Sequence, residues 1–129
     1  MRDLKNNISV QQSLAPASQT AAANGSGVDL QGFNSACAVI DAGAIGGTTP
    51  SFTFELQESD DNAAFTAVAD TDLEGVEPVL TAGDSVTRIG YTGNKRYLRV
   101  AITVASGTTP TLLCSAAFIL GNPASAPVA

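Results

Sequence analysis

The sequence predicts an all-β protein, an antiparallel β-sandwich with extended termini whose strands are joined as in a jelly-roll. Residues 52–57 alternate between apolar and polar, with Phe52, Phe54 and Leu56 on one face. Residues 96–105 repeat this alternation, and no segment shows helical periodicity over ten residues. About eight short strands separated by turn signals are typical of a sandwich. The length of 129 residues indicates one domain.

The chain divides into three parts by composition. Residues 1–27 are polar and rich in small side chains, so we predict a short edge strand near residues 8–14, then a loop or an arm that orders only against a partner. Residues 28–122 carry the strand patterns and form the predicted sandwich domain. Residues 123–129 follow a Gly-Asn-Pro stop and form a C-terminal tail.

The strands of the sandwich are predicted in order. Residues 36–41 are almost continuously apolar, which predicts a central strand joined by a hairpin to residues 52–57. A short strand at 64–68, an acidic connection at 70–83 that can carry Val79 and Leu80 inward, and a strand at 84–91 come next. The last strands are 96–105, with Leu98, Val100, Ile102 and Val104 facing inward, and 111–120, which is apolar on both faces.

Two turns of this chain share the sequence Gly-Thr-Thr-Pro, at residues 47–50 and 107–110. Each joins one predicted strand to the next. The repetition indicates either two similar hairpins placed in two sheets or the chance reuse of a good turn.

The charge distribution argues against nucleic acid as a partner. Only 14% of residues are charged, the net charge is −6, and eight acidic residues lie between Glu55 and Glu77. Such an acidic chain attracts phosphate weakly, so nucleic-acid binding is disfavoured. The acidic zone is either a solvated face or a surface that docks on opposite charges of a neighbouring subunit. Low charge with many Ala, Ser, Thr and Gly residues also predicts that much of the surface is either small and polar or covered by a partner.

The residues that most often perform chemistry are missing or isolated. Histidine is absent, which excludes histidine-based triads. Residues 70–75 resemble the start of a calcium loop, but Thr81 stands where a bidentate Glu is required. Glu58, Asp60 and Asp61 fit a solvated turn better than a paired-carboxylate site. We therefore expect no enzyme activity, no metal and no cofactor.

The two cysteines and two tyrosines have ordinary interpretations. Cys37 and Cys114 lie in apolar strands, and we expect two buried free thiols rather than a disulfide. Tyr91 and Tyr97 flank a turn and could form a sugar-binding platform, but we favour the interpretation that one Tyr packs in the fold and the other covers a strand surface. No apolar stretch follows the N-terminus, so we expect no signal peptide, and no apolar run is long enough for a membrane span.

Three stretches together resemble small head proteins of tailed bacteriophages. They are residues 50–61 (PSFTFELQESDD), 65–68 (FTAV) and 95–100 (KRYLRV), and the likeness extends over roughly 28–122. The resemblance is to capsid decoration, or cement, proteins. The order of these stretches is also similar to discoidin-like jelly-rolls that bind sugars, which usually carry a Trp and a calcium or disulfide clamp that are missing here.

The resemblance implies a structural virion protein that binds the outside of a tailed-phage head and stabilises the capsid. The implied partners are the major capsid protein and further copies of the chain, with a trimer as one option, on a particle made in the host cytoplasm; nucleic acid and membrane are not expected. The alternative is a carbohydrate-binding adhesion module. The candidate capsid contacts are the basic residues Arg2, Lys5, Arg88, Lys95, Arg96 and Arg99.

Overall fold

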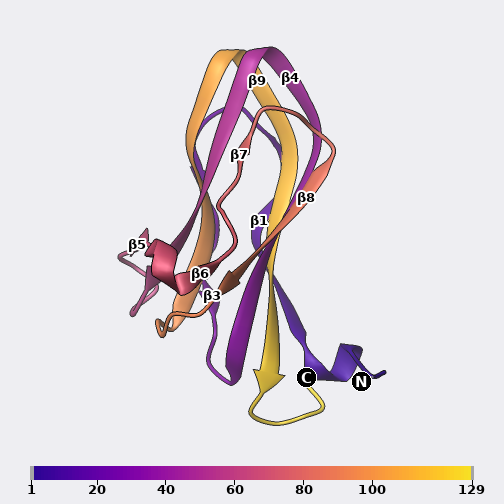
Figure 1. The fold of residues 1–129 in the computed structure, drawn as a ribbon, viewed down its shortest axis with the longest axis vertical. Helices are drawn as coiled ribbons and strands as arrows, with labels where there is room; N and C mark the ends of the chain where they lie inside the picture. The colour runs from indigo at the N-terminus through magenta and orange to yellow at the C-terminus, as the bar shows by residue number, and fades with distance from the viewer. Residues whose placement is uncertain (1, 129) are drawn as a thin grey trace.

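The computed structural model describes residues 2–128, and almost every regular element in it is a strand (Figure 1). The strands are β1 (Ser9–Gln19), β2 (Ala23–Asn24), β3 (Val28–Asp29), β4 (Phe33–Ser59), β5 (Thr66–Ala67), β6 (Leu73–Glu74), β7 (Val79–Leu80), β8 (Ser85–Tyr91) and β9 (Tyr97–Pro123). Two short 3₁₀ turns complete the chain, η1 (Lys5–Asn7) and η2 (Asp70–Asp72). No helix among residues 2–128 is long and apolar enough to cross a membrane.

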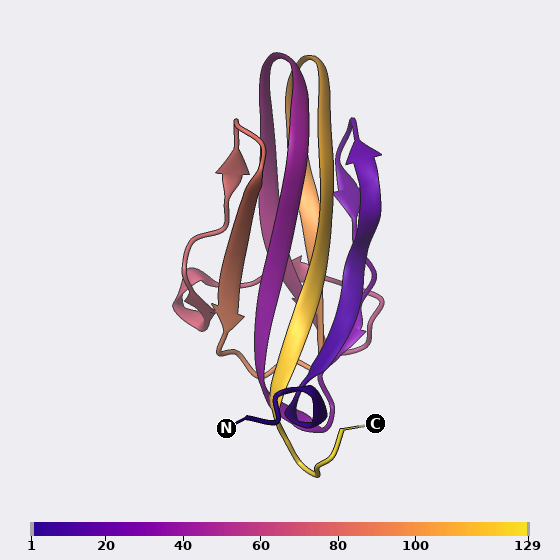
Figure 2. The same cartoon turned by 90° about the vertical axis from the view of Figure 1, so that its right-hand side faces the viewer.

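The fold is built on β4 and β9, two strands of 27 residues each. They run antiparallel and stay paired from Phe33↔Pro123 at one end to Ser59↔Tyr97 at the other. Both strands bend over at the top of the molecule, so the continuous sheet folds back on itself and its two halves face each other (Figures 1 and 2). The predicted antiparallel all-β fold is confirmed.

The folded sheet has two layers with different neighbours. In the first layer, β1 pairs with the second half of β9, and β8 pairs with the first half of β4. In the second layer, β2 and β3 pair with the first half of β9, while β5 and β7 pair with the second half of β4. Both layers belong to one continuous antiparallel sheet, and the jelly-roll connection of the strands stays a prediction.

The two Gly-Thr-Thr-Pro segments form the bends, and the predicted hairpin at the first of them is wrong. Residues 36–41 do not pair with residues 52–57, because β4 crosses from one layer to the other while keeping β9 as its partner. The bends need left-handed backbone: φ is +101° at Gly47 and +47° at Thr49, and +109° at Gly107 and +45° at Thr109. Thr48 pairs with Thr108, so the two bends lie side by side.

One hydrophobic core fills the space between the layers. The second layer contributes Phe52, Phe54, Leu56, Leu98, Val100 and Ile102, all at most 1% exposed, and the first layer contributes Ala38, Ile40, Leu112, Phe118 and Leu120. The prediction that Val104 faces inward is wrong. Ile102 opposes Phe54 but Val104 opposes Thr53, so Thr103 is an extra residue that reverses the alternation and leaves Val104 49% exposed. Val79 is also exposed rather than inward.

The N-terminal stretch is largely part of the sheet, so the loop predicted after residue 14 is wrong up to Gln19. β1 pairs with β9 from Ser9↔Leu120 to Gln19↔Leu112, through two register shifts. Leu14 joins the core, and the hydroxyl of the buried Ser13 accepts the N–H of Val100 at 3.0 Å and donates to the carbonyl of Ser26 at 2.9 Å. The arm interpretation missed these contacts because Ser13 and Leu14 are the only buried residues in a polar strand.

Candidate docking surface

The outer face of the first layer is the most unusual surface of the molecule. Residues directly opposite each other in an antiparallel pair lie on the same face of the sheet. The register therefore places three rows across the strands on this face, each written from the β1 side to the β8 side: Val10, Ile119, Cys37 and Gly90; Gln12, Ala117, Val39 and Arg88; Ser115, Asp41 and Val86. Leu113, which opposes Ser18 of β1, extends the face toward the bends.

Most of these outward side chains are apolar. Val10 is 61% exposed, Val86 70% and Leu113 51%, while Val39, Ile119, Ala117 and Cys37 are half-buried among them. Asp41 and Arg88 are the only charged side chains that β1, β9, β4 and β8 contribute to the three rows, and Glu74 of β6, which opposes Gly90, adds a third charge at the edge of the first row. We call this set the outer apolar face. An outward sheet face is normally polar, and a contiguous exposed apolar patch marks an interaction site.

The outer face of the second layer provides the comparison. There Thr53, Glu55 and Gln57 of β4 alternate with core residues, and Arg99 opposes Gln57 on β9. This is the wet face that the alternation of residues 52–57 predicts. The two layers thus share one core but differ in the surface they present: polar residues alternate along the second layer's outer face, where Val79 and Val104 are the exposed large apolar side chains, whereas apolar residues make up most of the first layer's outer face.

The six predicted basic contacts do not form one surface. Arg2 and Lys5 are exposed at the N-terminal end, with Lys5 in η1. Arg88 lies on the outer apolar face, and Arg99 lies on the outer face of the opposite layer. Their capsid-contact role stays a prediction, and only Arg88 lies on the candidate docking surface.

Three of these cations are already engaged by side chains of this chain. Lys95 Nζ lies 2.8 Å from Asp60 Oδ2, and this pairing raises the pKa of Lys95. Arg96 binds both carboxylate oxygens of Asp29, at 3.0 Å and 2.9 Å, and this bidentate pairing lowers the pKa of Asp29. Both pairs are exposed, so each contributes little to stability.

Arg99 is engaged differently, without an ion pair. It donates to Gln57 Oε1 at 2.7 Å, and its guanidinium lies over the ring of Phe65, 4.2 Å from the centroid. Cation–π stacking of this kind holds the side chain flat against the surface. Among the predicted basic contacts, Lys95 and Arg96 are therefore neutralised by carboxylates of this chain, whereas Arg99 is held by neutral groups and keeps its charge uncompensated.

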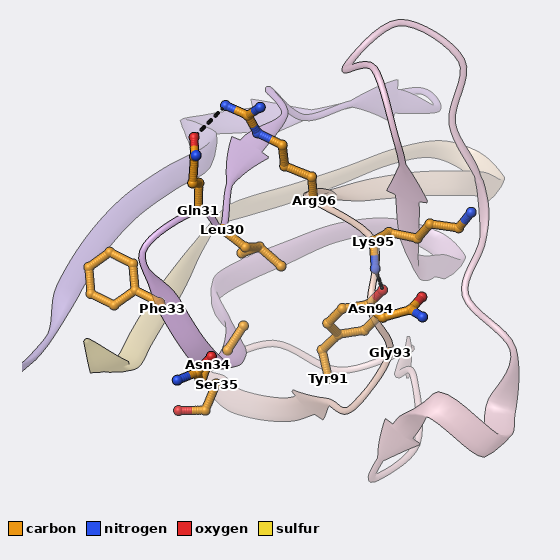
Figure 3. Close-up of a pocket in the computed structure, with 11 residues that line it drawn as sticks. Leu30, Gln31, Phe33, Asn34, Ser35, Tyr91, Gly93, Asn94, Lys95 and Arg96 are labelled. Carbon is orange, nitrogen blue, oxygen red and sulfur yellow. Dashed lines mark hydrogen bonds between the residues drawn. The ribbon is translucent and has the colours of Figure 1, made fainter. Parts of the chain in front are cut away.

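The two tyrosines do not form a platform. Tyr91 is 7% exposed, and its hydroxyl donates to Glu58 Oε1 at 2.8 Å and accepts the N–H of Lys95 at 3.0 Å. Burial raises the pKa of Tyr91 to about 12. Tyr97 lies under Arg96, whose guanidinium is 5.1 Å from the ring centroid. Tyr91 instead forms one wall of a pocket at the end of the first layer (Figure 3).

The remaining candidate sites carry no assembled chemistry within residues 2–128. No group of three or more metal-ligating side chains is found there, and Asp70 and Asp72 lie in the exposed turn η2. Cys37 and Cys114 are both free, as predicted. Cys114 is buried in the core, which raises its pKa, but Cys37 is only half-buried because it points to the outer apolar face.

The outer apolar face was missed by the sequence interpretation, although its signal was present. Residues 36–41 and 111–120 are apolar on both faces. Such runs predict strands covered on both sides. In the structure, only one side is covered by this chain.

The comparisons with known proteins give one relationship. The Bbp16 family model matches residues 18–117, from the end of β1 into the second half of β9. The match therefore includes both bends, the whole core of the second layer and most of the outer apolar face. Among curated proteins, none matches this chain.

Proposed function

The chain belongs to the Bbp16 family and is therefore a phage-related protein, and from this premise we propose that it is a structural virion protein that binds the outside of a tailed-phage head and stabilises the capsid. The resemblance to head decoration proteins supports the same role. No catalytic step is part of the proposal.

The outer apolar face is the observation that carries this proposal. A soluble monomer rarely leaves such a face in contact with water, because burying it against a partner is favourable by roughly 25 cal/mol per Å². A decoration protein needs one face committed to the head surface and the other in contact with solvent. The largely apolar outer face of the first layer and the more polar outer face of the second layer meet these two needs in a single folded sheet.

The proposed partners are the major capsid protein and neighbouring copies of this chain. Copies that occupy equivalent lattice positions gain from many weak contacts, so a modest affinity for each contact suffices. The proposed location is the capsid surface of the virion, after synthesis in the host cytoplasm. Nucleic acid and membrane have no part in this role.

The test measures attachment to undecorated heads by co-sedimentation. Leu113→Asp places a charge in the outer apolar face, and Val104→Asp is the matched control, because Leu113 and Val104 are 51% and 49% exposed on the same strand in opposite layers. We expect the wild type and Val104→Asp to bind heads and Leu113→Asp to bind at least about tenfold more weakly. Both variants should melt within a few degrees of the wild type.

Two outcomes would contradict the proposal. Failure of the wild type to associate with heads, or its recovery only with tails, would reject the head-binding role. Equal binding by Leu113→Asp and the wild type would move the interface away from the outer apolar face.

The carbohydrate-binding alternative receives less support from the geometry. Sugar recognition by stacking needs an exposed aromatic ring, whereas Tyr91 is almost fully buried and Tyr97 is covered by Arg96. A glycan array with the full chain distinguishes the two functions.

A further inference from the structure

The pocket at the end of the first layer is a gap in the sheet. It has a volume of about 420 Å³, within the usual range for ligand sites. β8 pairs with β4 only as far as Tyr91↔Ala36, and after Tyr91 the chain turns away. β4 continues for three more residues, 33–35, which have β9 on one side but no strand on the β8 side within the described chain. The pocket lies beside these three residues, where β8 would have continued.

The opposite wall of the gap is held in place by the chain itself. Leu30 donates its N–H to the carbonyl of Arg96 at 2.8 Å, and Lys95 donates its N–H to the hydroxyl of Tyr91. Figure 3 shows Leu30 and Tyr91 directed toward the space between the loop at 93–96 and the start of β4. The gap therefore persists without a ligand, because both of its walls are tied to the sheet.

The chemistry of the lining selects an uncharged partner. Leu30, Ala36 and Tyr91 supply apolar surface, while the ring of Phe33 is directed away from the other lining side chains (Figure 3). The polar lining consists largely of neutral side chains, Gln31, Asn34, Ser35 and Asn94, of which Gln31 already accepts a hydrogen bond from Arg96 at 2.7 Å. The two cations of the lining, Lys95 and Arg96, are already paired with Asp60 and Asp29. A strand edge, an apolar floor and neutral hydrogen-bonding groups together match an extended peptide.

We propose that this pocket is a strand-addition site that takes a short, uncharged, extended segment of another protein, with an apolar side chain directed to the floor. The segment pairs with residues 33–35 and continues the line of β8, over about 10 Å for three residues. Its main-chain groups pair with the open edge of β4 beyond Ala36, except at the N–H of Phe33, which is already donated to the carbonyl of Leu30 at 3.1 Å.

The ends of the same chain are not the occupant. Val128 donates its N–H to the carbonyl of Asn6 at 2.7 Å, so the two ends are tied to each other, and the N-terminal end carries Arg2, Asp3 and Lys5. If the segment comes from another protein of the phage particle, that assignment rests on the proposed function. The peptide site itself does not rest on it.

The experiment selects ligands from a ribosome-displayed library of random seven-residue peptides on the immobilised full chain. The best peptide is then synthesised and measured against the wild type, Asn94→Trp and Asn24→Trp. Asn94→Trp places a large ring at the pocket, and Asn24→Trp makes the same change at an exposed site in β2. We expect uncharged peptides with a central apolar residue, whose affinity falls at least tenfold for Asn94→Trp and is unchanged for Asn24→Trp.

Backbone methylation of the selected peptide separates strand addition from side-chain binding. One set of alternate N-methyl groups faces β4 and should abolish binding, while the other set faces away and should leave it intact. Enrichment of no peptide, equal binding by Asn94→Trp and the wild type, or indifference to both methylation sets would overturn the proposal. Sugar binding on a glycan array that Asn94→Trp abolishes would also overturn it. If the free protein self-associates and Asn94→Trp abolishes this association, the bound segment comes from a second copy of this chain. That result would contradict the proposal that the segment belongs to another protein.

Discussion

Replacing Ser13 with Ala tests whether the N-terminal strand is part of the fold. The Ser13 hydroxyl accepts the N–H of Val100, a residue with no exposed surface, and donates to the carbonyl of Ser26, an exposed residue. In Ser13→Ala the Ser26 carbonyl can turn to water, but the Val100 N–H is left without a partner. An orphaned buried donor costs about 1–3 kcal/mol. The small volume lost adds little to that cost.

That cost converts to a measurable shift in melting temperature. At about 2.1 cal/mol/K per residue, a chain of this length has an unfolding entropy near 0.27 kcal/mol/K, so each kcal/mol lowers the melting temperature by about 4 °C. We expect Ser13→Ala to melt about 4–11 °C below the wild type and to lose 1–3 kcal/mol in urea unfolding. Ser18→Ala, an exposed position on the same strand, is the control and should change stability by less than about 0.5 kcal/mol. If Ser13→Ala matches the control, the N-terminal strand is an independent arm after all.

Three further predictions follow from buried groups. Val100→Asp buries an unpaired charge in the core and should cost at least about 4 kcal/mol, comparable to the whole stability; a soluble variant with wild-type melting would contradict the core assignment. Burial raises the pKa of Glu77, whose carboxylate accepts the N–H of Leu56, so the charge of Glu77 destabilises the fold above that pKa and the penalty disappears as pH falls through it. Glu77→Gln should therefore be at least as stable as the wild type at pH 7, and its stability should change less with pH above about pH 4.5. A Glu77→Gln variant less stable than the wild type would refute this. A thiol reagent on the native protein should label Cys37 first and Cys114 only after denaturation, so peptide mapping that finds Cys114 labelled first would be the contrary result.

The sequence was sufficient where side-chain alternation is undisturbed. Phe52, Phe54 and Leu56 point into the core beside Leu98 and its neighbours on the paired strand, because each strand keeps a period of two and the polar face meets water. The same method failed at Val104, since a single extra residue at Thr103 reverses the alternation and leaves no mark in the local composition.

The candidate surface was harder to predict than the fold. A strand that is apolar on both faces has the same sequence whether its second face meets its own chain or another protein, so the runs that contain Val39 and Ile119 do not reveal which of the two covers them. The two ion pairs could not be predicted from the sequence for a different reason. Lys95 pairs with Asp60 and Arg96 with Asp29 across 35 and 67 residues, and charge spacing along the chain carries no information at such separations.

The paired bends allow a last prediction that depends on the two-layer architecture. A Cβ at Gly47 would lie 2.6 Å from the carbonyl oxygen of Thr109, and a Cβ at Gly107 would lie 2.6 Å from the carbonyl oxygen of Thr49, so each glycine makes room for the opposite bend. Both also have left-handed φ, which adds strain for any other residue. We therefore expect Gly47→Ala and Gly107→Ala each to lose more than about 1 kcal/mol, by similar amounts, whereas Gly32→Ala pays only the φ strain, because φ there is +93° and nothing lies within 4 Å of its Cβ position. Urea unfolding of the three variants measures the difference. If Gly32→Ala is as damaging as the other two, the close approach of the bends contributes nothing. If only one bend is sensitive, the two segments do not support each other and β4 and β9 fold over independently.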